Sequence, residues 1–159
     1  MEIRKLSKLL KIILTGLFIL SIILYAFVIP LIGKTIAEAN LEFSSWYLPW
    51  LIFLSLTGVP VFMALFYSSK ISKNISNDLA FTEENSKYLK YISKLALIDS
   101  IFFFLGNIAM LLLNMNHPSV LILSFWVSFL GLSLYVIFLL LSYFIGKAAI
   151  LKDENDLTI

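Results

Sequence analysis

The residues best suited to chemistry in this chain are one carboxyl group and two amides within a long apolar stretch. They are Asp99, Asn107 and Asn114. At about 100° per residue around a helix, Asn107 falls about 80° from Asp99, and Asn114 falls about 60° from it. All three can therefore share one face, and a polar face on a helix in lipid points toward other helices or toward water.

Two interpretations of this candidate polar face stay open. As a functional site, it is a proton or cation site, or a contact for a buried ligand. As a structural feature, it forms hydrogen bonds between helices, with Lys147 or a serine of the last apolar block as the partner. That block contains two pairs of small residues that permit close helix approach, Ser124 with Ser128 and Ser142 with Gly146.

The residues that the chain lacks argue against several classes of membrane enzyme. The chain has no cysteine, and therefore no disulfide, thiol nucleophile or thiolate metal site. Its single histidine, His117, cannot supply the histidine pairs that ligate haem in b-type cytochromes, and it stands beside Pro118 where a turn is expected. The sequence also lacks a phosphate-binding glycine loop and a His/Glu metal cluster within the apolar blocks. We therefore expect a non-enzymatic protein with no catalytic residue, no cofactor and no metal.

Composition predicts that the whole chain lies in a membrane. Hydrophobic residues make up 60% of its 159 residues and charged residues only 14%, unlike a soluble domain. Crossing a bilayer takes about 20 helical residues, and four blocks are long enough. We predict an all-α integral membrane protein with one domain, 1–159, whose spans cover about 12–33, 46–68, 91–114 and 119–146. An inner connection covers about 69–90.

The basic residues predict the orientation of these spans, because Lys and Arg are retained on the cytoplasmic side of short loops. With both termini inside, eleven of the twelve Lys and Arg residues lie on the inner side, and only Lys34 lies outside. Trp46, Tyr47 and Trp50 then begin the second span at the outer interface, as an aromatic belt requires. Both termini are therefore predicted to be cytoplasmic.

The N-terminal block has a second interpretation as a secretory signal. Ala37, Glu38 and Ala39 resemble the small-residue cleavage site of such a signal. However, a signal has an apolar core of about 7 to 15 residues, and the uncharged run here extends over 12–33. An uncleaved first span is the expected state.

Two predicted cytoplasmic segments form a candidate surface for a partner. Thr82, followed by Glu83, Glu84 and Asn85, has the composition of a helix start, since a hydroxyl can accept from a free backbone amide and acids suit the positive end of the helix dipole. At the C-terminus, an acidic tail can bind a basic protein surface. It contains Asp153, Glu154, Asn155 and Asp156.

These segments also resemble a known family. The run Ala80, Phe81, Thr82, Glu83, Glu84 and Asn85, with Leu89 and Ile92 after it, is similar to the "PF(S/T)xEN…L…I" pattern of the bacterial membrane proteins called domain of unknown function 2975. The ending from Leu151 to Ile159 resembles that family's "LxxENDLTI" tail. Ala80 stands in place of the family's proline, which leaves the shape of the preceding loop open.

The resemblance implies four spans in a bacterial plasma membrane, with both ends inside. It also implies a partner protein, since members often accompany a small helix-turn-helix transcription regulator of the Cro type. We therefore expect a sensor or anchor that lies in the lipid bilayer and controls such a cytosolic regulator, without binding nucleic acid itself. The alternative is a small transporter or export-linked protein that uses the Asp99 face. The sequence leaves a homo-oligomer open.

Overall fold

The computed structural model describes residues 3–156, and it describes side chains for residues 5–155. In chain order the elements are α1 (Ile3–Ile23), η1 (Leu24–Val28), α2 (Ile29–Ala39), η2 (Leu41–Trp46), α3 (Tyr47–Ser76), α4 (Glu83–Leu112) and α5 (Pro118–Asp156). The first three follow one another without a break. η1 is a π-helical segment directly before Pro30, whose missing N–H interrupts the regular helical ladder.

Four long helical segments are apolar enough to cross a membrane, which confirms the predicted all-helical class. Most large apolar side chains on these helices are exposed, whereas the buried set includes several serines and two asparagines. A soluble protein shows the opposite distribution. The outer surface therefore suits a hydrocarbon solvent.

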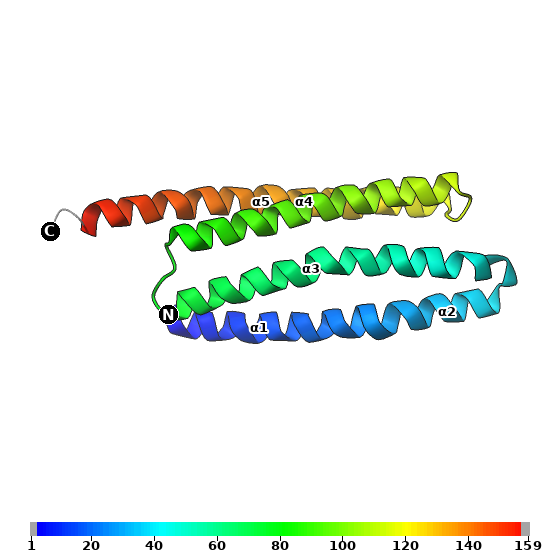
Figure 1. Cartoon of the computed structure of the whole chain (residues 1–159), viewed down its shortest axis with the longest axis horizontal. Helices are drawn as coiled ribbons and strands as arrows, with labels where there is room; N and C mark the ends of the chain where they lie inside the picture. Colours follow the sequence, from blue (N-terminus) through cyan, green and yellow to red (C-terminus); the bar gives the residue numbers. More distant parts are fainter. Residues whose placement is uncertain (1–2, 157–159) are drawn as a thin grey trace.

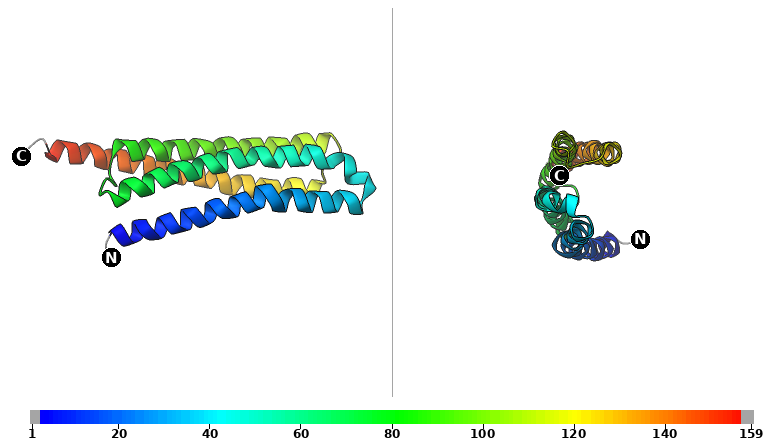
Figure 2. Two further views of the ribbon diagram at one scale, coloured as in Figure 1. Left: turned by 60° about the horizontal axis from the view of Figure 1, so that its bottom comes forward. Right: turned by 90° about the vertical axis from the view of Figure 1, so that its right-hand side faces the viewer.

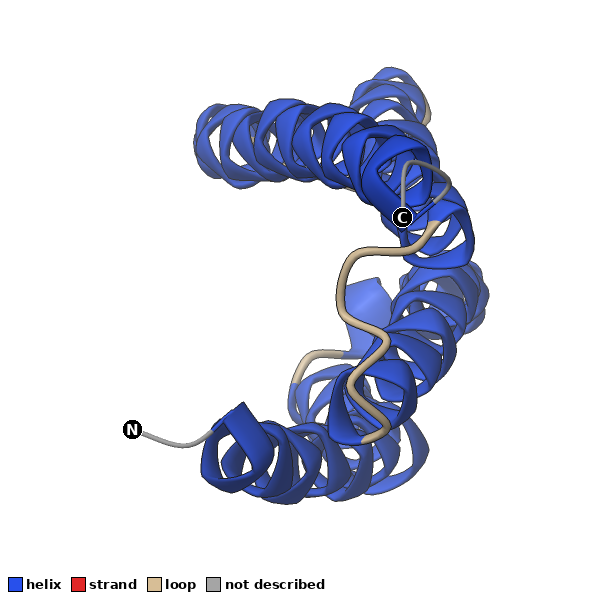
Figure 3. Cartoon of the chain, turned by 90° about the vertical axis from the view of Figure 1, so that its left-hand side faces the viewer, coloured by secondary structure: helices blue, strands red, loops and turns tan. Residues whose placement is uncertain are grey.

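The four rods lie side by side in the order of the sequence (Figure 1). Within the described residues, α1 and α2 contact α3, α3 contacts α4, and α4 contacts α5, but α5 does not contact the first rod or α3. Seen along the helices, the rods follow a C-shaped curve instead of closing into a bundle (Figures 2 and 3). The middle helices are α3 and α4, and the curve has one concave face.

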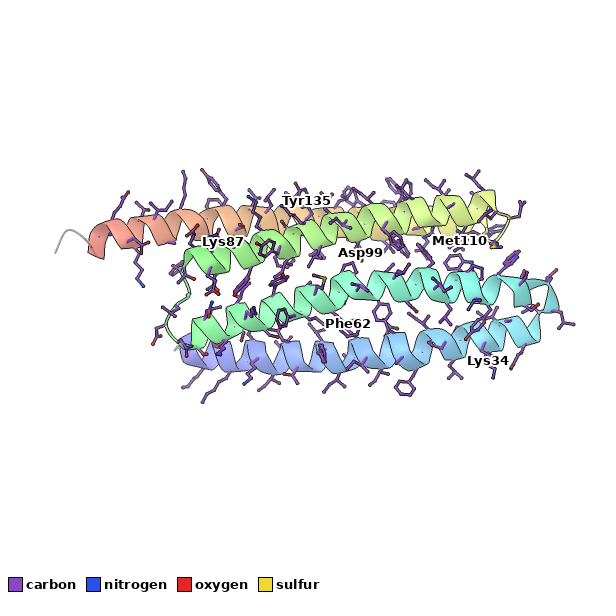
Figure 4. The ribbon with its side chains drawn as sticks, in the orientation of Figure 1. Lys34, Phe62, Lys87, Asp99, Met110 and Tyr135 are labelled. Atoms are coloured by element: carbon purple, nitrogen blue, oxygen red, sulfur yellow. The ribbon has the colours of Figure 1, made fainter. Side chains whose placement is uncertain are left out.

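The start of α1, the end of α5 and the α3–α4 connection lie at the same end of the molecule (Figure 1). We call this the basic end. Lys87 lies toward it, Lys34 lies toward the opposite, far end, and Asp99 lies between them (Figure 4). The structure thus separates the basic residues along the helix axis in the way that the charge pattern predicts.

The helices do not end where the predicted spans end. α4 ends at Leu112, two residues before the predicted end of the third span. Most of the inner connection predicted at about 69–90 is helical, because α3 continues to Ser76 and α4 begins at Glu83, directly after Thr82. Each helix therefore extends beyond the apolar block inside it: α4, with 30 residues, is about 45 Å long against a hydrocarbon core of about 30 Å.

Candidate functional site

The concave face contains a groove of 590 Å³. Its walls come from η1, α2, α3, α4 and α5. The groove therefore lies on the inner side of the curve, where all of these elements face one another. Most of the lining is apolar. The polar side chains along it are Tyr25, Thr57, Ser68, Asp99, Ser100 and Ser128. Asp99 is the only formally charged one, so the groove carries one acidic group in an apolar setting.

Two polar atoms in this groove are buried without a hydrogen-bond partner among the described residues. They are Oδ1 of Asp99, on α4, and Oγ of Ser128, on α5. A buried polar atom without a partner costs about 1–3 kcal/mol, so most such atoms in native proteins are paired. The groove that Asp99 and Ser128 line is therefore a candidate binding site.

The predicted structural partner of Asp99 does not bind it. The ammonium of Lys147 lies over the ring of Tyr143, 5.0 Å from the ring centroid. A serine of the last apolar block does not bind it either: the hydroxyl of Ser128 has no partner among the described residues, and that of Ser124 donates to the carbonyl of Leu121 at 2.7 Å. In the described part of the chain, no hydrogen-bond donor pairs with Oδ1 of Asp99.

The predicted polar face does not bring its three residues together. Asn107 is fully buried, but it does not line the groove; its Nδ2 donates to the carbonyl of Phe103 at 2.9 Å, and its Oδ1 accepts from Nδ2 of Asn116 at 3.1 Å. The placement of Asn114 on this face is wrong. Asn114 follows the end of α4 with a φ of 55°, a left-handed conformation that asparagine tolerates in turns.

Small side chains join α4 and α5 in a seam that the sequence analysis missed. On α4 the seam repeats every seven residues, at Ser86, Ser93, Ser100 and Asn107. On α5, a Cβ added to Gly131 would lie 2.1 Å from the hydroxyl of Ser100, and one on Gly146 would lie 3.0 Å from that of Ser86. The seven-residue repeat was the available signal, because it keeps one stripe facing a partner helix.

The expected small-residue pairs of α5 belong partly to this seam. Ser142 bonds to Ser86 across it, and Ser124 is buried with its hydroxyl bonded to the carbonyl of Leu121. Ser128 instead lines the groove. The same helix therefore supplies both a packing stripe and one wall of the site.

The wall of the groove near the first rod is positioned by Tyr25. Its hydroxyl lies 3.3 Å from Oγ1 of Thr57, on α3. Since Thr57 donates its own proton to the carbonyl of Leu54 at 2.7 Å, Tyr25 is the donor between the two hydroxyls. A Cβ on Gly58 would lie 3.1 Å from the tyrosine ring, so the glycine makes room for this contact.

The predicted partner surface at the α3–α4 connection includes one buried residue. Asn85 is fully buried: its Nδ2 donates to the carbonyls of Leu79 at 2.8 Å and Ala80 at 2.9 Å, and its Oδ1 accepts from Asn74 at 2.9 Å. Its backbone N–H donates to Oγ1 of Thr82, which caps α4 as predicted. Asn85 therefore holds the connection in shape and is not a contact surface for a partner.

The two glutamates of this segment are exposed. Glu83 pairs with Lys87 at 3.0 Å, and Glu84 accepts hydrogen bonds from Asn74 and from the hydroxyl of Tyr88. The first turns of α4 precede its membrane-spanning part, which is predicted to begin near residue 91. There the hydrogen bond from Tyr88 lowers the pKa of the Glu84 carboxyl below its ordinary value of 4.5 and raises the pKa of Tyr88.

The acidic tail begins on the last turns of α5, which extend past the start of α4 at the basic end (Figures 1 and 2). Asp153, Glu154 and Asn155 are exposed there. Asp156 is the last residue of α5, and its side chain lies outside the described part, as do residues 157–159. Within the described residues, no three His, Cys, Asp or Glu side chains come together as a metal site requires.

Comparison with known proteins places this architecture in a family. The chain is 26% identical over 151 residues to the "Uncharacterized membrane protein YoaS" of Bacillus subtilis (strain 168), with 92% of each chain covered. No solved structure matches it. Residues 31–159 match the family described as "Protein of unknown function (DUF2975)". Since this match covers most of the chain, the protein is a multi-pass membrane protein that belongs to the DUF2975 family.

Proposed function

We propose that this protein is a non-enzymatic membrane anchor or sensor that binds a basic cytosolic protein through the acidic extension of α5. The observation that carries the proposal is the end of α5, which continues as helix beyond the start of α4 (Figure 1). Three polar residues of this extension are exposed: Asp153, Glu154 and Asn155. A helix that extends from the membrane presents such residues in a fixed arrangement and at low entropic cost.

The proposed orientation has both termini in the cytoplasm of a bacterial cell. It rests on the position of eleven basic residues on one side of the spans and of Lys34 on the other. The far end, with the exposed Lys34–Glu38 pair at 3.7 Å, would then face outward. In this orientation the exposed Glu83 and Glu84 add acidic groups on the same side as the α5 extension.

The partner that fits this surface is a protein with a basic face, and DNA-binding regulators of the helix-turn-helix type have one. Complementary charge speeds association and orients the partner more than it raises affinity. Binding at the membrane would hold such a regulator away from its DNA. The protein would act through sequestration and would need no catalytic group.

The test combines crosslinking in intact cells with charge reversal. Asp153→Lys with Glu154→Lys is expected to abolish the crosslink to a helix-turn-helix protein that the unchanged chain gives. Glu38→Lys with Glu42→Lys, which makes the same charge change elsewhere in the chain, should leave it intact. The proposal fails if the crosslinked proteins include no DNA-binding regulator, or if both double variants behave like the unchanged chain.

Transport of a small solute is a second candidate, favoured by the unpartnered Asp99 oxygen in the groove. A transporter that couples its substrate to a proton or cation needs an ionisable group inside the membrane. Asp99→Asn should then abolish uptake or export, whereas deletion of 153–159 should spare it. The regulator proposal predicts the reverse pattern of effects.

A further inference from the structure

The groove on the concave face has an unusual combination of walls. Apolar side chains from η1, α2, α3, α4 and α5 surround a single carboxyl group, that of Asp99. Among the described residues, no Lys or Arg lines the groove to balance it. Oδ1 of Asp99 is buried and lacks a partner among the described residues. An occupant of the groove can therefore meet this carboxyl only through its other oxygen, Oδ2.

A lipid acyl chain would fill the apolar volume but leave the Asp99 carboxyl without a partner. The cost would be about 1–3 kcal/mol, and more for a charged carboxylate. Water alone would satisfy the carboxyl but not the apolar walls. An occupant that satisfies both needs a hydrocarbon body and a hydrogen-bond donor, and a cationic donor also balances the charge of Asp99.

We propose that the groove binds a hydrophobic amine in its protonated form, with the ammonium at Asp99 and the hydrocarbon body along α3 and α5. The groove volume of 590 Å³ lies within the range of about 300–1,000 Å³ that holds drug-sized ligands. The inference concerns the groove alone and does not depend on the cytosolic partner.

The shape of the fold provides a route of entry. Among the described residues, no Cα atom of α5 lies within 8 Å of one in the first rod, and the ribbon leaves the concave side open between them (Figure 3). A molecule dissolved in the bilayer can enter sideways without crossing the polar ends. Asp99 lies in the middle part of the molecule between Lys87 and Lys34 (Figure 4). The amine would thus have to leave the membrane interface to reach Asp99. This requirement favours amines with an apolar body.

The experiment measures binding of radiolabelled dodecylamine to the full chain in phosphatidylcholine nanodiscs, with empty discs subtracted. Dodecanol, which has the same chain without the charge, is the matched probe. Asp99→Asn keeps the shape of the side chain and should weaken amine binding about tenfold or more, as expected for one lost charge-assisted hydrogen bond. Asp153→Asn, the same change outside the groove, should have no effect.

Dodecanol is expected to bind more weakly than the amine, and its affinity should be the same for the unchanged chain and the Asp99→Asn variant. Equal amine binding by the unchanged chain and the Asp99→Asn variant would overturn the proposal, as would no saturable binding above that of empty discs. A disulfide between two copies carrying Leu130→Cys, at an exposed residue of the groove lining, would show that a second copy fills the groove, and would overturn it too. Because Asp99→Asn leaves the acidic tail intact, crosslinking of a regulator should be unaffected, and the two proposals can fail separately.

Discussion

Ser86 and Ser142 bond to each other twice, since the hydroxyl of each donates to the backbone carbonyl of the other at 2.8 Å. Ser7 and Ser72 are arranged in the same way between α1 and α3, at 3.0 and 3.4 Å. Each outer rod of the curve is thus attached to a middle helix by a reciprocal serine pair. Apolar side chains add little to helix association in lipid, so such polar contacts and close packing maintain the arrangement.

Replacing either serine of the α4–α5 pair with alanine should lower the free energy of unfolding. The expected loss is about 0.5–1.5 kcal/mol for Ser86→Ala or Ser142→Ala, because each removes one interhelical donor. The double variant should lose less than the sum, since both changes act on one contact. Unfolding in mixed detergent and lipid micelles measures the free energy that each single variant and the double variant lose. Ser133→Ala is the control, because that hydroxyl bonds only within its own helix, to Phe129; purely additive losses would contradict the prediction.

Gly106→Ala should separate α3 from α4. A Cβ at this position would lie 2.1 Å from the ring of Phe53, which is buried and packed against Trp50, Phe102 and Phe103. These neighbouring rings restrict how far the ring of Phe53 can shift, and overpacking of this kind costs about 1–3 kcal/mol. Thermal unfolding in micelles checks the loss. Gly16→Ala provides the comparison, since nothing lies within 4 Å of its added Cβ and it should not lower the unfolding temperature.

Asn85→Ala should loosen the α3–α4 connection without unfolding the spans. The change removes both donors to the carbonyls of Leu79 and Ala80 and the acceptor for Asn74. Hydrogen exchange followed by mass spectrometry should show faster exchange in the connection and the first turn of α4. The exposed Asn77→Ala, in the same connection, should leave the rates unchanged. If both variants exchange alike, Asn85 does not organise this segment.

The Glu84 carboxyl should titrate below its ordinary pKa of 4.5, because the Tyr88 hydroxyl stabilises its charged form. A depressed folded pKa means that this contact stabilises the connection above the ordinary pKa, and that its contribution is lost as pH falls through the folded value. NMR of a chain labelled at glutamate side chains measures the pKa. Tyr88→Phe should raise it toward 4.5, whereas Tyr91→Phe should not; an unchanged titration in Tyr88→Phe would exclude the proposed cause.

Orientation in the membrane can be measured directly because the chain has no cysteine. Single variants Glu38→Cys and Asp153→Cys place one thiol near each end of the molecule. In intact cells, an impermeant maleimide should label the thiol at position 38 and reach the one at position 153 only after lysis. The opposite pattern would invert the proposed topology and place the α5 extension outside the cell.

Much of the fold could be predicted from local patterns. Uncharged blocks of sufficient length can only be helices in a membrane, because lipid offers no partner to an open backbone. Thr82 as the cap of α4 was predictable for the same kind of reason, since its hydroxyl bonds three residues along the chain. The position of Lys34 opposite the other basic residues also followed from the number of Lys and Arg residues on each side of the predicted spans. These features depend on neighbours in the sequence and on the solvent.

The tertiary structure decided which polar residues are available. Asp99 and Asn107 appear equivalent in the sequence, yet Asn107 is buried at the far turn against Asn116, and Asp99 lines an open groove. Asn85 and Glu84 are adjacent, yet one is buried and the other exposed. The cause is the open, curved order of the helices, which leaves α5 out of contact with the first rod. Helices of similar apolar character can associate in several orders with similar energies, so small contacts such as Gly106 against Phe53 and Ser86 against Ser142 make the choice.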